Sequence, residues 1–202
     1  MSDFHVSKSE HLGDAGFLKI TKDTVEGPGV DPFTRVTVRH VGAVVVVAVD
    51  DDGRAVMVRQ FRSAVDGDIL EVVAGKRDVD GEPPAVTASR ELAEEVGLEA
   101  GRLVPLAEFY NSPGFTDEYT YLFLALELES LGAPEPQGPE ERAMTVERVP
   151  LAMVDELIAT RGIIDAKSII ALLLAQRFLA GEYRGLDASP GGPSGGDGAV
   201  RS

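Results

Sequence analysis

Two patterns of apolar residues divide the first third of the chain into strands. Residues 17–21 and 34–39 alternate apolar with polar side chains, and a Gly-Pro-Gly segment at 27–29 separates them. Alternation on both sides of turn residues is typical of a hairpin-like pair of strands. Residues 41–49 form a continuous apolar run, which predicts a buried central strand, and residues 55–62 predict the next strand.

The spacing of apolar residues changes near residue 85. Ala85, Ala88, Leu92 and Val96 recur every three or four residues, so they would form one face of a helix that packs on a sheet. Gly97 follows directly, in the position of a glycine that ends a helix. The other predicted elements are strands at 70–73, 103–110, 119–126 and 143–146 and helices at 151–160 and 166–180.

The order of these elements predicts the fold class and the domain organisation. Strands first, one helix between strands, and helices at the end are typical of an α+β arrangement or an α/β/α sandwich. The end of the chain is rich in Gly, Ser and Pro, which is typical of disorder. We expect, in order, a flexible N-terminus, a small antiparallel β domain, a main domain and a disordered tail, with the bounds 1–12, 13–41, 42–183 and 184–202.

Composition and charge exclude several classes of partner. The chain has 202 residues, of which 44% are hydrophobic, so it can bury a core of its own. Its net charge of −15 argues against nucleic acid and anionic membranes, since both attract basic surfaces. We see no apolar run long enough to span a membrane and no signal peptide. The absence of cysteine excludes disulfides and is consistent with a cytoplasmic location.

Several carboxylates stand close together on the predicted helix. Glu91, Glu94 and Glu95 fall within about one turn, and Glu82 lies at the start of the same helix. Like charges at this spacing repel each other, so a stable helix that carries them is expected to bind a cation. Hard oxygen ligands favour Mg²⁺, with Mn²⁺ as a substitute, over zinc. The alternative is an acidic helix face exposed to solvent.

These carboxylates belong to a longer motif, E-x7-R-E-U-x-E-E-x-G-U with U apolar, which runs from Glu82 to Leu98. The motif resembles the Nudix box, so the chain resembles a Nudix hydrolase, an enzyme that cleaves a diphosphate joined to another group. The resemblance implies an α/β/α sandwich with a mixed sheet. It also implies that Arg90, Gly75 and Gly97 are the structural residues of the box. One departure is that six residues, one more than in the box, separate Gly75 from Glu82.

The resemblance also assigns the metal ligands. Glu91 and Glu95 are expected to be the main ligands of Mg²⁺, with Glu94 and the Ala74 carbonyl adding further ligands. The residue equivalent to Glu82 is either a ligand or a support in Nudix enzymes, and both roles stay open here. The metal would neutralise the phosphoryl oxygens and turn water into a nucleophile.

Three segments outside the box resemble ADP-ribose pyrophosphatases of the Nudix family: V-R-Q-F-R at 58–62, S-P-G-F-T-D-E at 112–118 and D-A-K-S-I-I-A-L-L at 165–173. The first segment implies that an arginine reaches the substrate, since an arginine fork suits a phosphate. The second implies specificity for ADP-ribose, which the family marks with a proline. The substrate-binding candidates are Arg62, more weakly Arg59 and Arg39, and the loop residues Pro113, Gly114 and Phe115.

The general base is expected on the acidic loop at 132–142. The resemblance implies a loop glutamate in this role, and we favour Glu141, then Glu140, because they lie just before the strand predicted at 143–146. Taken singly, each is better explained as a solvated loop residue. Gly and Pro earlier in the loop would let it close over a substrate.

The resemblance as a whole implies Mg²⁺-dependent hydrolysis of ADP-ribose to AMP and ribose 5-phosphate by attack of water on the diphosphate. It also implies a homodimer in which the N-terminal strands exchange between subunits, so that each active site is composite. One alternative is another substrate, such as GDP-mannose or a dinucleotide, because a fold does not fix the substrate. Another is a sensor that binds ADP-ribose without cleaving it, against which the intact set of glutamates argues.

Overall fold

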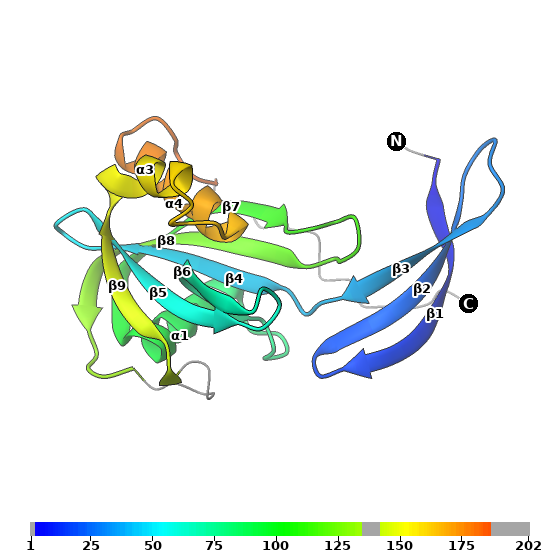
Figure 1. Cartoon of the computed structure of the whole chain (residues 1–202), viewed down its shortest axis with the longest axis horizontal. Coiled ribbons are helices and arrows are strands. Elements are labelled where there is room, and N and C mark those ends of the chain that lie inside the picture. The colour runs from blue at the N-terminus through cyan, green and yellow to red at the C-terminus, as the bar shows by residue number, and fades with distance from the viewer. Residues whose placement is uncertain (1–2, 135–141, 187–202) are drawn as a thin grey trace.

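The computed structural model describes residues 3–134 and 142–186, and in this part of the chain the strands form two separate sheets (Figure 1). The first is a three-stranded antiparallel sheet of β1 (His5–Ala15), β2 (Leu18–Glu26) and β3 (Phe33–Arg39). It stands to one side of the rest of the molecule, and a short connection from β3 to β4 joins it to the second sheet.

The second sheet has six strands in the order β7-β8-β4-β6-β5-β9 within the described residues. β4 pairs in parallel with β8, whereas the other neighbours pair antiparallel, so the sheet is mixed, as predicted. The strands are β4 (Ala43–Val49), β5 (Arg54–Arg62), β6 (Gly67–Lys76), β7 (Leu98–Tyr110), β8 (Tyr119–Ser130) and β9 (Thr145–Pro150).

Helices cover both faces of this second sheet. α1 (Pro84–Val96) packs on one face, where Leu92 lies in a cluster with Val44 and Val46 of β4. The 3-10 helix η1 (Leu151–Met153), α3 (Val154–Ala159) and α4 (Ala166–Leu179) pack on the other face. The predicted α/β/α sandwich is therefore confirmed.

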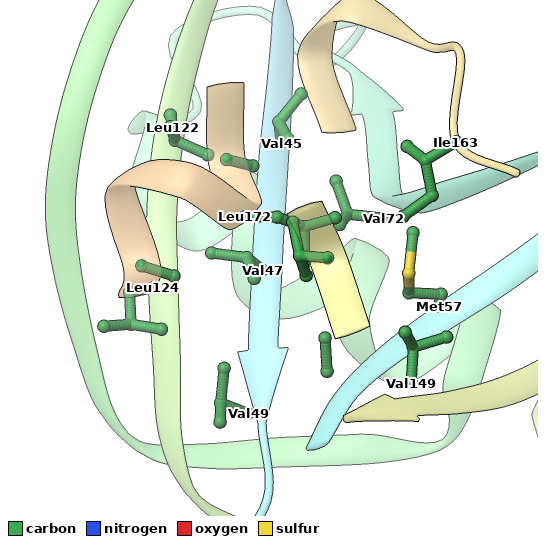
Figure 2. Close-up of a cluster of buried hydrophobic side chains, with 14 of the residues drawn as sticks. Val45, Val47, Val49, Met57, Val72, Leu122, Leu124, Val149, Ile163 and Leu172 are labelled. Atoms are coloured by element: carbon green, nitrogen blue, oxygen red, sulfur yellow. The ribbon is translucent and has the colours of Figure 1, made fainter. Parts of the chain in front are cut away.

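The central strand β4 shows why its sequence is apolar at every position. Val45, Val47 and Val49 point to the face covered by α4, where Figure 2 shows them around Leu172. The alternate residues of β4 point to the face covered by α1. Because neighbouring side chains of a strand point to opposite faces, a strand buried on both sides needs an unbroken apolar run.

Gly97 ends α1, as predicted. Its φ of 66° lies in the left-handed region, and its N–H donates to the Ala93 carbonyl at 3.0 Å. A Cβ at this position would collide with the Gly132 carbonyl. Only glycine fits both the conformation and the space, and the turn that it makes leads directly into β7.

The structure differs from expectation at the start of the chain and in β7. We expected residues 1–12 to be flexible, whereas residues 5–12 belong to β1, whose backbone pairs with β2 along its whole length. Most side chains of β1 are exposed, so burial left little pattern in the sequence. β7 begins at Leu98, earlier than the predicted residue 103.

Of the tail expected to be disordered, residues 187–202 lie outside the described part. Within the described residues, no helix is long and apolar enough to cross a membrane.

Candidate active site

α1 carries its glutamates to the side of a cleft of about 500 Å³. The apolar side of α1 packs against the sheet, and its polar side brings Glu91, Glu94 and Glu95 to the cleft. The other walls of the cleft come from β5, β6, the start of α4 and the turn between β1 and β2. The three box carboxylates thus lie in one concave site.

The backbone of β6 runs directly beside these carboxylates. A Cβ built on Gly75 would overlap the Cγ, Cδ and Oε1 atoms of Glu91, so the box glycine is needed to admit this side chain. Glu95 is buried, and its Oε2 accepts a hydrogen bond from the Ala74 N–H at 3.4 Å. The structure therefore brings together the predicted ligands Ala74, Glu91 and Glu95.

Arg90 lies among the carboxylates of the box and of the preceding loop. Its Nη1 donates to Glu91 at 2.8 Å and to Glu94 at 3.2 Å. Its Nη2 donates to Glu82 at 3.4 Å and lies 3.7 Å from Asp78. These contacts tie α1 to the loop before it, as expected for the structural arginine of the box.

Glu82 does not line the cleft. Its Oε2 accepts hydrogen bonds from Thr87 Oγ1 at 2.7 Å and from Arg90. The hydrogen bond from Thr87, followed by the bond and charge of Arg90, lowers the pKa of Glu82. Of the two roles left open, this geometry favours the support of α1 over the binding of metal.

The donor set fits a divalent cation. Burial raises the pKa of Glu91, and the charges of Glu94 and Asp78 add to this effect although Arg90 opposes it. Such a group is stabilised by a nearby cation. Within the described residues, the side chains as they stand form no group of three or more acidic or histidine residues that could hold a metal ion. Arg90 Nη1, which binds both Glu91 and Glu94, is therefore the internal cation with which a metal would compete.

Arg62 and Lys167 are two of the cationic side chains that line the cleft. Arg62 on β5 donates from Nε to the buried carboxylate of Glu71 at 3.0 Å, and Lys167 near the start of α4 lies 2.7 Å from Asp165. Burial alone would lower the pKa of Arg62, but the hydrogen bond and charge of Glu71 raise it overall. Both carboxylates hold their cations in place, where they suit the oxygens of a phosphate.

The other two predicted arginines do not line the cleft. Arg59 alternates with Arg62 on β5 and so lies on the opposite face, where its Nε donates to Glu147 at 2.6 Å. Arg39 donates to Asp23 at 2.6 Å and to Asp117 at 3.3 Å, at the end of the N-terminal sheet.

The loop at 112–118 is fixed to the end of β3. The Phe115 carbonyl accepts a hydrogen bond from the Val38 N–H at 2.8 Å, and Asp117 accepts one from the His40 N–H at 2.8 Å. Glu118, at the end of the loop, lines the cleft. The other three predicted residues of the loop are exposed and do not line the cleft: Pro113, Gly114 and Phe115. The candidate bases Glu140 and Glu141 lie outside the described residues.

Some cleft residues carried no signal that we used in the sequence. Phe17, at the turn between β1 and β2, packs edge-on against His40 with 5.1 Å between ring centroids, and Lys76 Nζ lies 4.6 Å from the centroid of the Phe17 ring. These residues come together only because the two sheets meet at the cleft. Gln60 could have been found, since it shares a face of β5 with Arg62.

A mixed sheet between helices thus presents glutamates and cations to one cleft, an arrangement that suits a metal ion together with a phosphate. A family model of the NUDIX domain matches residues 38–173, and the chain belongs to this family.

The chain is similar to two bacterial relatives over most of its length. It is 37% identical to an ADP-ribose pyrophosphatase of Mycobacterium tuberculosis over 179 residues, which are 89% of this chain and 86% of the relative. It is 40% identical to an ADP-ribose pyrophosphatase of Bacillus subtilis over 167 residues, which are 83% of this chain and 89% of the relative. Among solved structures, an ADP compounds hydrolase has the same fold, with a TM-score of 0.79, 22% identity, and coverage of 90% of this chain and 97% of that chain.

Proposed function

We propose that this Nudix hydrolase uses Mg²⁺ to cleave ADP-ribose into AMP and ribose 5-phosphate. The observation that carries the proposal is the meeting of Glu91 and Glu95 with the Ala74 backbone at one end of a cleft that also holds Arg62. The choice of ADP-ribose is supported by the names of the two ADP-ribose pyrophosphatases, to which the chain is 37% and 40% identical.

Glu91, Glu95 and the Ala74 carbonyl would hold the divalent cation, with Glu94 as a further ligand. When bound, the cation neutralises charge on the diphosphate and activates water, and Mn²⁺ could replace Mg²⁺ in this role. Oxygen ligands of this kind suit both ions. The box residues therefore provide charge and position rather than covalent chemistry.

Arg62 and Lys167 would bind the phosphate oxygens of the substrate. Both are fixed by acidic partners, so little conformational freedom is lost when a phosphate binds. Water adds to one phosphorus, the bridging P–O bond breaks, and the leaving phosphate takes the bridging oxygen. The attacking water loses a proton, for which Glu141, and after it Glu140, is the proposed acceptor. If Glu140→Gln lowers kcat and Glu141→Gln does not, this assignment moves by one residue.

The N-terminal sheet supports a proposal about assembly. Val6, Leu12 and Val36 are exposed on its strands, although an isolated three-stranded sheet usually needs cover for its apolar side chains. We infer a homodimer in which the N-terminal sheet of β1, β2 and β3 exchanges between subunits and completes a site on the domain at 42–183. A fully active monomer, measured by light scattering and turnover at the same concentration, would contradict this.

Product analysis in parallel tests the substrate. ADP-ribose, GDP-mannose, NADH, diadenosine polyphosphates and 8-oxo-dGTP are each incubated with the protein and Mg²⁺, and the products are separated by chromatography. We expect AMP from ADP-ribose to appear first. Preferred cleavage of another compound would overturn the reading of the loop at 112–118. Binding of ADP-ribose without any cleavage would indicate a sensor.

A cytoplasmic location is proposed from the lack of cysteine alone.

A further inference from the structure

We propose that Asp78 is a further residue of the cation site. When Glu91 and Glu94 bind a divalent cation, Asp78 holds the guanidinium of Arg90 away from that cation. The inference rests on the proposed function, because it takes the cation at these glutamates as given. Asp78 lies in the segment 76–81 between Gly75 and Glu82, where the chain has one residue more than the Nudix box. Of the two aspartates in this segment, Asp78 lines the cleft and Asp80 does not.

The neighbouring residue Arg77 fixes this loop to the body of the domain. Its N–H donates to the Gly42 carbonyl at 3.1 Å, and its Nη2 donates to the Glu82 carbonyl at 3.1 Å. Its guanidinium carbon also lies 4.9 Å from the centroid of the Tyr121 ring, within range of a cation–π contact. With Arg77 anchored in this way, Asp78 lines the cleft.

The contacts of Arg90 fall on two sides. Nη1 faces the proposed ligands, with Glu91 at 2.8 Å and Glu94 at 3.2 Å. Nη2 faces Glu82 at 3.4 Å and Asp78 at 3.7 Å. Nε is buried and has no hydrogen-bond acceptor in the described residues. If the ligand carboxylates turn to a cation, Arg90 must depend on the acceptors on its Nη2 side.

Asp78 is the one of these two acceptors that has room to adjust. The Glu82 side chain is 13% exposed and already accepts a hydrogen bond from Thr87 at 2.7 Å. The Asp78 side chain is 53% exposed, and its 3.7 Å contact with Arg90 is longer than a hydrogen bond. A small rotation of Asp78 would close this gap as Arg90 withdraws, and the pair would then reduce the repulsion between Arg90 and the cation.

Titration of the metal-free protein with Mn²⁺ tests the inference without any turnover. Electron paramagnetic resonance measures free Mn²⁺ for the wild type, Asp78→Asn, Asp78→Glu and Asp80→Asn. Asp80→Asn is the matched control, because it removes the same charge from the same loop at an exposed residue that does not line the cleft. We expect Asp78→Asn to raise the Kd for Mn²⁺ about tenfold, as loss of a partner around a metal site commonly does. Asp78→Glu should recover most of the affinity, and Asp80→Asn should keep it.

Each other outcome has a distinct meaning. An unchanged Kd in Asp78→Asn, or equal weakening in Asp78→Asn and Asp80→Asn, would overturn the role of Asp78 while leaving the cation site intact. If the wild type itself bound no Mn²⁺, the proposed cation site would fail first, and the inference about Asp78 would fail with it.

Discussion

Gly75 and Glu91 are in direct contact, because the side chain of Glu91 occupies the space where any other residue at 75 would carry its Cβ. The contact joins the end of β6 to the polar side of α1. It brings the Glu91 carboxylate beside the strand whose Ala74 N–H binds Glu95. The position of the Glu91 carboxylate thus depends on the absence of a Cβ at residue 75.

Gly75→Ala should displace Glu91 and lower kcat/KM for ADP-ribose about 100-fold, the usual effect of moving a catalytic group by about 1 Å. Gly67→Ala, on the same strand, is the control, because its new Cβ would meet only the Val65 carbonyl at an ordinary 3.8 Å. Steady-state kinetics of both variants decide the point. Equal activity of Gly75→Ala and the wild type would show that the Glu91 position is unimportant.

Arg62 and Arg59 should differ sharply when each is replaced by leucine. Arg62 lines the cleft, so Arg62→Leu should raise KM for ADP-ribose about 10- to 100-fold, the range for loss of a charged hydrogen bond. Arg59 lies on the other face of β5 with Glu147, so Arg59→Leu should leave KM within about twofold. Similar KM values for the two variants would refute this assignment.

Arg62→Leu also leaves the buried Glu71 without its cation, which destabilises the fold. The double variant Arg62→Leu/Glu71→Leu removes this unpaired charge and should recover the melting temperature. It should not recover KM, because the phosphate contact is still missing. Recovery of both quantities would mean that Arg62 acts only through stability.

The stability of the N-terminal sheet should depend on pH through Asp23. Burial by itself would raise the pKa of Asp23, but hydrogen bonds from Ser9 and Thr37 and the charge of Arg39 lower it below the ordinary 3.8. Because the pKa of Asp23 is lower in the folded state, its ionised carboxylate stabilises the fold at pH values above the unfolded-state pKa. This stabilisation is lost as the pH falls through the folded-state pKa. Asp23→Asn should therefore cost about 1–3 kcal/mol at pH 7, and the difference from the wild type should shrink below about pH 4.

Melting curves of the wild type and Asp23→Asn between pH 3 and 8 measure this effect. Asp68→Asn is a control with an exposed carboxylate on a strand of the other sheet. A gap between wild type and Asp23→Asn that stays constant down to pH 3 would contradict the role of the ionised carboxylate.

The sequence predicted the sheet, the helices and the box residues of the main domain because their apolar spacing and charges are local. β1 could not be predicted in this way, since its backbone pairs with β2 while its side chains stay mostly exposed. The cluster of Phe17 with His40 and Lys76 was missed for a different reason. It joins residues from two sheets, and no local pattern records such a contact.

Glu95→Gln tests the central claim most directly. The substitution keeps the size of a buried side chain and removes the charge that would hold the cation, so kcat for ADP-ribose with Mg²⁺ should fall at least about 100-fold. Circular dichroism and light scattering should show an unchanged fold and assembly, and Glu99→Gln, at an exposed site just beyond α1, should keep full activity. Release of AMP by Glu95→Gln at the wild-type rate would contradict the assignment of the cation site and of the hydrolysis that depends on it.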